Sequence, residues 1–478
     1  MIRSLWRDSV VYAAGTLVTR GLGLLLLPLY TRVLSPAQFG VLELVITAGV
    51  LVNLVVPMET SQAMARLWNE RPPGSARRAL AGTGLTFALV AYAIFALLAW
   101  VFDAALVGAL NDPAADVATV HAGAAFIACN GLLLTLQGQF RSALRPRSFA
   151  FASVGYAALV LVGMGLFVGQ DGVGVARVLW LQAAAAALVA AACLVSLRGE
   201  VAWGIDRSEL GRMLDYSLPL VPAGLAMFAT VNAHRFMLGW LGSLEQVGLF
   251  GLASRVASVT TLVLIGVQAS LTPLIYAHHE DPATPVKLAR LFELFWSASL
   301  LVCLALNAFA AELMALVGRP AYAAAAGLLV WLAPAALLSQ MYIFAPGIPL
   351  AKKSGHQLAL TAASASVGLA LSAGLIPHFQ AAGAAAATCV AAGLFLGGWW
   401  WIGQALYPLP VRAGRLSGVT LAYVGLSVAM ACTSGEGGQR TPWWIGTGSM
   451  VLLLALVVMA GLLDVRQLAR PRSEPGRV

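Results

Sequence analysis

The chain has 478 residues, of which 60% are hydrophobic and only 10% are charged, and its mean hydropathy is +0.84. A soluble domain carries roughly 25% charged residues and cannot bury so much apolar surface in one core. The composition therefore excludes a soluble enzyme, a fibrous protein and a disordered chain. Continuous apolar runs of about 20 residues also argue against a transmembrane barrel, whose strands alternate apolar and polar residues.

Fourteen apolar segments follow one another along the chain, and each is predicted to be a membrane-spanning helix. The first is interpreted as a span and not as a removed signal peptide, because it is long and lacks an A-x-A-like cleavage site. The predicted segments are 10–32, 41–65, 83–108, 117–140, 149–168, 174–197, 215–241, 247–275, 290–317, 323–346, 357–376, 381–405, 416–432 and 443–463.

The positions of the 29 Lys and Arg residues test this count. With the N-terminus in the cytoplasm, 22 of them fall on the cytoplasmic side, four fall in outer loops and three fall within spans. The outer four are Arg32, Arg177, Arg319 and Arg440, and the three within spans are Arg20, Arg235 and Arg255. This asymmetry predicts an all-α polytopic membrane protein with both termini in the cytoplasm. The net charge of +9 then reflects orientation and gives no reason to expect nucleic acid as a partner.

Two short segments that lie 208 residues apart share a pattern. Residues 34–41, LSPAQFGV, and 242–249, GSLEQVGL, place Ser, Gln and Gly at the same spacing in a predicted outer turn. An offset of six spans predicts a parallel repeat, with chance similarity of two turns as the alternative. We therefore predict six-helix bundles at 1–210 and 211–410. Two additional helices and a basic cytoplasmic tail follow at 411–478.

Charged residues within spans indicate the kind of cargo. Arg20 lies about ten residues into the first span, where an arginine costs about 2.5–3.5 kcal/mol on translocon scales. It shares a helical stripe with Tyr12, Thr16 and Gly23, which are predicted to line a wet cavity. A structural ion pair is the alternative for each such charge.

Arg235 and Arg255 lie on either side of the second outer turn, and Asn232 shares the face of Arg235 and is predicted to line the cavity. If these arginines meet, they require an anion, either a glutamate or a ligand. Glu59, after a predicted kink at Pro57, is a candidate for ion coupling or for pairing with an arginine.

The clearest intramembrane charges are cationic, which favours a cargo that bears phosphate or another anion. Arg20, Arg235 and Arg255 are the predicted diphosphate-binding residues. No phosphate-cradling ATPase motif and no long loop occur, so we expect transport without a catalytic residue or cofactor. No metal site is expected either: the cysteines lack suitable spacing, and residues 278–281, HHED, are best interpreted as a solvated loop.

Residues 15–41, GTLVTRGLGLLLLPLYTRVLSPAQFGV, resemble the start of the Wzx-type polysaccharide-biosynthesis flippases of the multidrug/oligosaccharidyl-lipid/polysaccharide exporter superfamily. Residues 234–239 and 247–250, with Arg255, resemble the counterpart in the second bundle of that family. The resemblance implies fourteen helices in two lobes around a cationic cavity. It also implies movement of a sugar linked to undecaprenyl diphosphate across the cytoplasmic (inner) membrane, as in O-antigen lipopolysaccharide or exopolysaccharide biosynthesis.

By the same resemblance Arg20 would bind the pyrophosphate, as a first-helix arginine does in related lipid II flippases, and the last two helices would help hold the lipid tail. Residues 23–28 lack the Arg-Asp pair of those flippases, which favours another glycan than the peptidoglycan precursor. Expected partners are the lipid-linked oligosaccharide, membrane lipids, and a glycan polymerase or glycosyltransferases. The alternatives are a cation/drug antiporter of the same superfamily, a membrane-embedded transferase, and a non-transporting scaffold of a glycan assembly complex.

Overall fold

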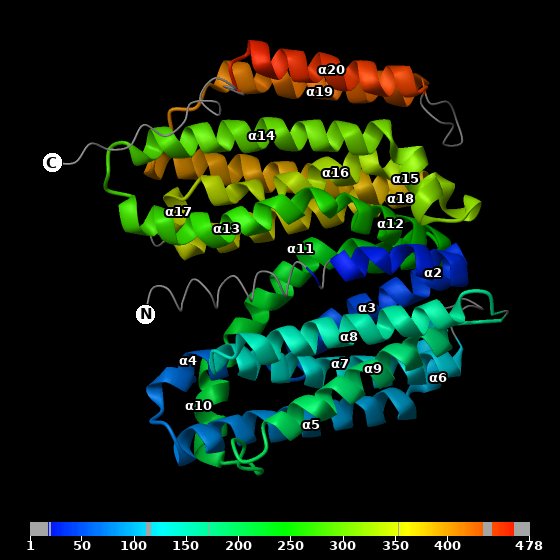
Figure 1. Cartoon of the computed structure of the whole chain (residues 1–478), viewed down its shortest axis with the longest axis vertical. Helices are drawn as coiled ribbons and strands as arrows, with labels where there is room; N and C mark the ends of the chain where they lie inside the picture. Colours follow the sequence, from blue (N-terminus) through cyan, green and yellow to red (C-terminus); the bar gives the residue numbers. More distant parts are fainter. Residues whose placement is uncertain are drawn as a thin grey trace. The chain divides into compact units, whose positions relative to one another are not determined.

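The computed structural model describes residues 18, 21–110, 116–170, 172–351, 353–433 and 442–462. Every regular element within these residues is a helix (Figure 1). The α-helices are α2 (Leu27–Val33), α3 (Pro36–Val55), α4 (Thr60–Leu67), α5 (Ser75–Val101), α6 (Asp103–Leu110), α7 (Val117–Ser142), α8 (Pro146–Phe167), α9 (Val175–Ser196), α10 (Arg207–Ser217), α11 (Leu220–Leu241), α12 (Leu244–Ala257), α13 (Val259–His278), α14 (Thr284–Ala308), α15 (Ala310–Val317), α16 (Leu329–Leu338), α17 (Gly347–Leu350), α18 (Ser354–Leu406), α19 (Ala413–Thr433) and α20 (Trp443–Met459). Three 3-10 helices join them: η1 (Trp68–Glu70), η2 (Pro320–Leu328) and η3 (Met341–Phe344).

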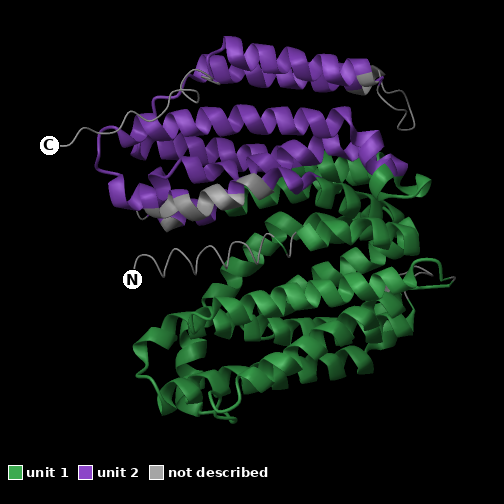
Figure 2. Cartoon of the chain, viewed as in Figure 1, with its two compact units in different colours: residues 1–256, 316–322, 361–388 green, residues 257–315, 323–360, 389–478 purple. Residues whose placement is uncertain are grey.

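The chain divides into two compact units (Figure 2). Unit 1 comprises Met1–Val256, Leu316–Tyr322 and Thr361–Thr388, and unit 2 comprises Ala257–Ala315, Ala323–Leu360 and Cys389–Val478. Within unit 1, α7 packs against α5, α8 and α9, and their apolar faces form a buried cluster. Within unit 2, Trp399 is 1% exposed and donates its indole N–H to the carbonyl of Ala345 at 2.8 Å. The predicted division into two six-helix bundles stays a prediction.

Several helices have the length and composition of membrane spans. Nine helices within the described residues are long and apolar enough to cross a membrane, and the pair α10 and α11, bent by 46°, makes a tenth if it is counted as one span. Helix α18 has 53 residues, about 80 Å at the usual rise, which is more than two thicknesses of the hydrocarbon core. Its backbone leaves the helical region at Gln380, where φ is 51° and ψ is −130°. The predicted segments 357–376 and 381–405 lie on either side of that break. The prediction of an all-helical, polytopic membrane protein is confirmed.

Short breaks interrupt some of the predicted spans. The predicted segment 41–65 consists of α3 and α4, which are separated at Pro57, as expected for a residue without a backbone N–H. Glu59 begins α4 with a φ of 54°, a left-handed conformation that is uncommon for a residue with a side chain. The predicted segment 247–275 is likewise broken at Ser258, between α12 and α13.

Candidate functional site

A glutamate from α3 meets two arginines, one from α11 and one from α12, inside unit 1. Oε1 of Glu43 lies 2.6 Å from Nη2 of Arg255, and Oε2 of Glu43 lies 3.5 Å from Nη1 of Arg235. Arg235 also donates to the hydroxyl of Thr47, one turn further along α3, at 3.3 Å. The guanidinium carbon of Arg255 lies 5.7 Å from the centre of the Phe39 ring. The two arginines therefore do approach each other, and Glu43 is the anion between them.

The Glu43 cluster, formed by Glu43, Arg235 and Arg255, carries one negative and two positive charges. The side chain of Glu43 is 1% exposed, whereas those of Arg235 and Arg255 are 20% and 28% exposed. Neither carboxylate oxygen of Glu43 has a well-aligned hydrogen bond to a described residue, and the same holds for Nε of Arg235. Buried charges without aligned hydrogen bonds are costly. Charge attraction therefore holds the cluster together, and Nε of Arg235 is buried without a hydrogen-bond partner among the described residues.

Two glycines bring α3 and α12 into close contact beside this cluster. A Cβ added to Gly40 would overlap the carbonyl oxygen of Leu244, and a Cβ added to Gly248 would overlap the carbonyl oxygen of Pro36. Pro36 and Gly40 precede Leu244 and Gly248 by the same 208 residues, so the two contacts exchange under the offset of the predicted repeat. The two matching segments thus pack on each other, and only glycine allows this approach. A Cβ at Gly251 would likewise lie 2.6 Å from Cγ of Glu43.

Replacing Gly40 or Gly248 with alanine is expected to lower the free energy of unfolding by about 1–3 kcal/mol, because a helix backbone must move to admit the methyl group. Gly165 in α8 is the matched control, since a Cβ added there meets no atom within 4 Å. Thermal unfolding of the purified variants in detergent measures the difference. Equal melting temperatures for Gly40→Ala and Gly165→Ala would contradict the observed crossing of α3 and α12.

The other predicted site residues are less completely placed. Arg20, Tyr12 and Thr16 lie outside the described residues. Gly23 is half-buried, and a Cβ added there would meet no atom within 4 Å. Asn232 is half-buried on α11.

Glu59 is half-buried at the start of α4 and forms no ion pair within the described residues. The structure therefore joins Arg235 with Arg255 but gives no such contact for Glu59. His278 and His279 are exposed, and the described part of the chain contains no group of three or more His, Cys, Asp or Glu side chains suited to a metal ion.

The sequence analysis missed two neighbours of Glu43 that complete the cluster. Phe39 and Thr47 lie one helical turn before and after Glu43 on α3, so the i, i+4 spacing places all three side chains on one face. Phe39 is fully buried and supplies the aromatic face for Arg255. Thr47 donates its hydroxyl to the backbone oxygen of Glu43 at 2.6 Å and also accepts from Arg235.

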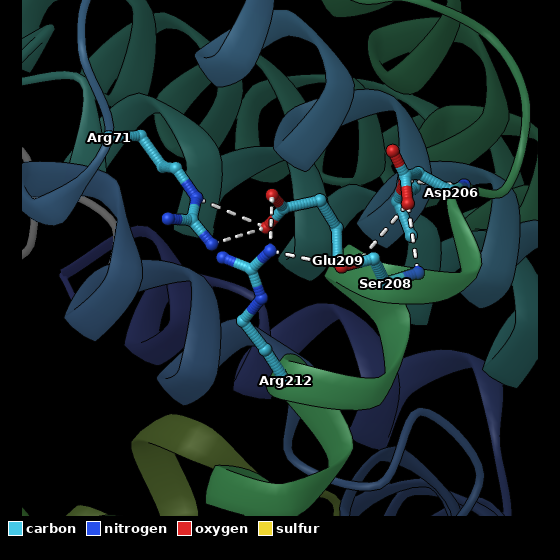
Figure 3. Close-up of polar contacts among 6 residues, drawn as sticks. Arg71, Asp206, Ser208, Glu209 and Arg212 are labelled. Carbon is cyan, nitrogen blue, oxygen red and sulfur yellow. Dashed lines mark hydrogen bonds and ion pairs between the residues drawn. The ribbon is translucent and has the colours of Figure 1, made fainter.

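A second buried carboxylate pairs with arginines elsewhere in unit 1 (Figure 3). Arg71 donates from Nε at 3.2 Å and from Nη2 at 3.0 Å to one oxygen of Glu209, and Arg212 lies 3.8 Å from the other oxygen. The side chain of Asp206 begins α10 by accepting the backbone N–H groups of Ser208 and Glu209. The sequence analysis used these arginines only to orient the chain. In the structure Arg71 ties the segment after α4 to α10, whereas Arg212 and Glu209 both lie within α10.

Comparison with known proteins identifies one matching family and several similar solved structures. A family model described as "Polysaccharide biosynthesis protein" matches residues 5–279, whereas a comparison with curated proteins gives no match. The structure of the lipid II flippase MurJ in an inward closed conformation is similar, with a TM-score of 0.74, 10% sequence identity, and coverage of 96% of this chain and 100% of that chain. An inward-facing multidrug resistance MATE family transporter of the MOP superfamily is similar with a TM-score of 0.64 and 16% sequence identity. That match covers 86% of this chain and 99% of that chain. A MOP superfamily transporter from Pyrococcus furiosus is similar with a TM-score of 0.54 and 15% sequence identity. That match covers 83% of this chain and 96% of that chain.

These likenesses establish the fold. The protein is an all-helical, multi-pass membrane protein with the fold of solved MOP superfamily transporters. The chain belongs to the polysaccharide biosynthesis protein family, whose model matches more than half of it.

Proposed function

We propose that this protein is a flippase that moves a lipid-linked oligosaccharide or polysaccharide repeat unit, carried on undecaprenyl diphosphate, across the cytoplasmic membrane. The observation that carries the proposal is membership of the polysaccharide biosynthesis family on a transporter fold. The excess of positive charge in the Glu43 cluster supports an anionic cargo, because guanidinium groups bind phosphate in a bidentate manner. No covalent bond changes during such transport, so no catalytic residue is required.

The topology that we propose has fourteen spans, with six in each bundle (1–210 and 211–410), two in the segment 411–478, and both termini in the cytoplasm. The described helices support the count beyond the ten long spans. Two shorter apolar helices lie at Gly21–Val33 and Trp444–Met459, α18 is long enough for two crossings, and α12 with α13 covers the predicted eighth span. The excess of Lys and Arg in the predicted cytoplasmic loops supports the orientation.

The mechanism is alternating access between the two predicted bundles. The diphosphate enters from the cytoplasmic side and is neutralised by Arg20, helped by Arg235 and Arg255. Contacts between α3 and α12 and between Glu43 and its two arginines join the bundles in the described arrangement, so an outward opening must separate them. When the opening separates Arg235 and Arg255 from Glu43, a phosphate bound by the two arginines offsets the free-energy cost of losing that ion pair.

The prenyl tail stays in the apolar phase throughout. Unit 2 contains an apolar pocket of about 410 Å³ between α14, the second part of α18 and α19, lined by residues that include Trp296, Gly397 and Trp400. Helices α19 and α20 correspond to the two additional predicted helices. We assign this pocket to the lipid tail, and we expect a glycan polymerase or glycosyltransferases to act on either side of the transport step.

Purified protein reconstituted into vesicles tests the function. The vesicle membrane contains a prenyl-diphosphate oligosaccharide, and an ion gradient and a membrane potential are imposed across it. A glycosidase added outside the vesicles cleaves the sugar that becomes exposed. The protein is expected to expose sugar from the inner leaflet faster than vesicles without protein do. Equal rates with folded protein, under both gradients and in their absence, would contradict the flippase.

A further inference from the structure

A polar pocket in unit 1 has no part in the transport route proposed above. It has a volume of about 480 Å³, within the range of small-molecule sites, and residues at the ends of helices line it. They come from the end of α2, the start of α3, the turn between α8 and α9, and the segment 316–322. In the predicted topology these helix ends face the outer side of the membrane.

Hydrogen bonds fix the walls of this pocket. The hydroxyl of Tyr322 donates to the backbone oxygen of Leu34 at 3.0 Å, and the hydroxyl of Thr31 donates to the backbone oxygen of Val317. Ser35 and Gln38 form a capping box at the start of α3, in which each side chain accepts the backbone N–H of the other residue. These hydrogen bonds therefore fix the positions of the backbone segments that form the walls of the pocket.

Two arginines converge on the pocket. Arg32 and Arg319 both line it, both are exposed, and neither forms an ion pair within the described residues. They are two of the four basic residues that the chain places in its predicted outer loops, where basic residues are scarce. No acidic residue occurs among the described residues that line the pocket. Asp171 lies outside the described residues, and the two arginines keep the charge positive even when Asp171 is counted.

We propose that this pocket binds the phosphate group of a lipid headgroup in the outer leaflet. Arg32 and Arg319 supply guanidinium groups that match phosphate oxygens. Gly174, at the start of α9, places the positive end of that helix at the same pocket. The lining also includes apolar residues such as Val33 and Val173, as suits a headgroup whose acyl or prenyl chain remains in the bilayer. The lipid is either a membrane phospholipid or a glycan carrier, and its phosphate is the shared feature that the pocket recognises.

Native mass spectrometry of the purified full-length protein tests this site without requiring transport. The probes are short-chain phosphatidylglycerol, a short-chain prenyl phosphate, inorganic phosphate as competitor, and short-chain diacylglycerol as the neutral control. Wild-type protein is expected to bind the phosphate lipids and not diacylglycerol. Inorganic phosphate is expected to compete, and the tighter of the two phosphate lipids identifies the source of the ligand.

Substitutions then locate the binding. Arg32→Gln and Arg319→Gln are each expected to weaken lipid binding by about tenfold, because each removes charge-assisted hydrogen bonds. Arg177→Gln is the matched control: Arg177 is an exposed arginine in the first turn of α9 that does not line the pocket. Conversion of both pocket arginines to lysine should give intermediate affinity. Unchanged binding by the double glutamine variant, an equal loss in Arg177→Gln, or equal binding of diacylglycerol would overturn the proposal.

Discussion

Replacing Glu43 with glutamine is expected to destabilise the described arrangement by about 3–5 kcal/mol, because it leaves two arginines partly buried without their counter-charge. This free energy corresponds to a shift of about 100-fold or more in the balance between conformations. The contact of α3 with α11 and α12 is then no longer favoured. The conformation that is closed on the outer side is therefore depopulated, and the transport cycle cannot be completed. The melting temperature in detergent and the rate of sugar exposure in vesicles should both fall.

Glu245→Gln is the matched control, because Glu245 is an exposed carboxylate in the first turn of α12, the helix that α3 contacts, and its substitution removes the same charge. A variant with Glu43, Arg235 and Arg255 all changed to glutamine separates stability from transport. It carries no uncompensated buried charge, so its melting temperature should recover, while its transport should not because the cations are absent. If Glu43→Gln behaved like Glu245→Gln in both assays, the Glu43 cluster would have no role in the cycle.

Replacing Arg20 with alanine is expected to abolish transport while the protein still folds. Truncating one partner of a buried charge pair typically costs about 2–5 kcal/mol, which corresponds to about 30-fold or more in rate or affinity. Arg20→Lys should rescue only partly, because an ammonium group keeps the charge but not the bidentate geometry. The vesicle assay measures the rate, and size-exclusion chromatography with thermal unfolding measures the folded fraction.

Arg147→Ala serves as the control for the loss of an arginine, since Arg147 is exposed in the first turn of α8. It should transport at the wild-type rate. Full activity of Arg20→Ala would remove the central residue of the proposed diphosphate site. Loss of folded protein in Arg20→Ala, with Arg20→Lys fully active, would assign Arg20 a structural role instead.

The positions of the helices could be predicted well from the sequence, because a segment inside a bilayer must satisfy its backbone hydrogen bonds within itself. The predicted segment 149–168 matches α8 within three residues at its start and one at its end. The breaks were harder to predict. Pro57 carries its own signal, and the gap between the predicted segments 357–376 and 381–405 contains the break at Gln380, whereas the break at Ser258 was not predicted.

The candidate site was predicted in part. One tight turn joins the helices of Arg235 and Arg255, so their approach follows from local spacing. The identity of their counter-charge did not, because Glu43 is about 200 residues away and reaches them only through the crossing of α3 with α12. The predicted repeat contains a signal for it: its 208-residue offset pairs Glu43 with Gly251, the residue whose missing side chain makes room for the carboxylate.

Mass spectrometry of lipid-linked sugars in cells depleted of this protein tests the central claim most directly. The account predicts that a prenyl-diphosphate oligosaccharide accumulates on the cytoplasmic leaflet, and its mass would identify the cargo. Restoring the wild-type protein should clear the accumulated lipid, whereas Arg20→Ala should not. An unchanged lipid pool, in cells with no second transporter of this family, would contradict the account.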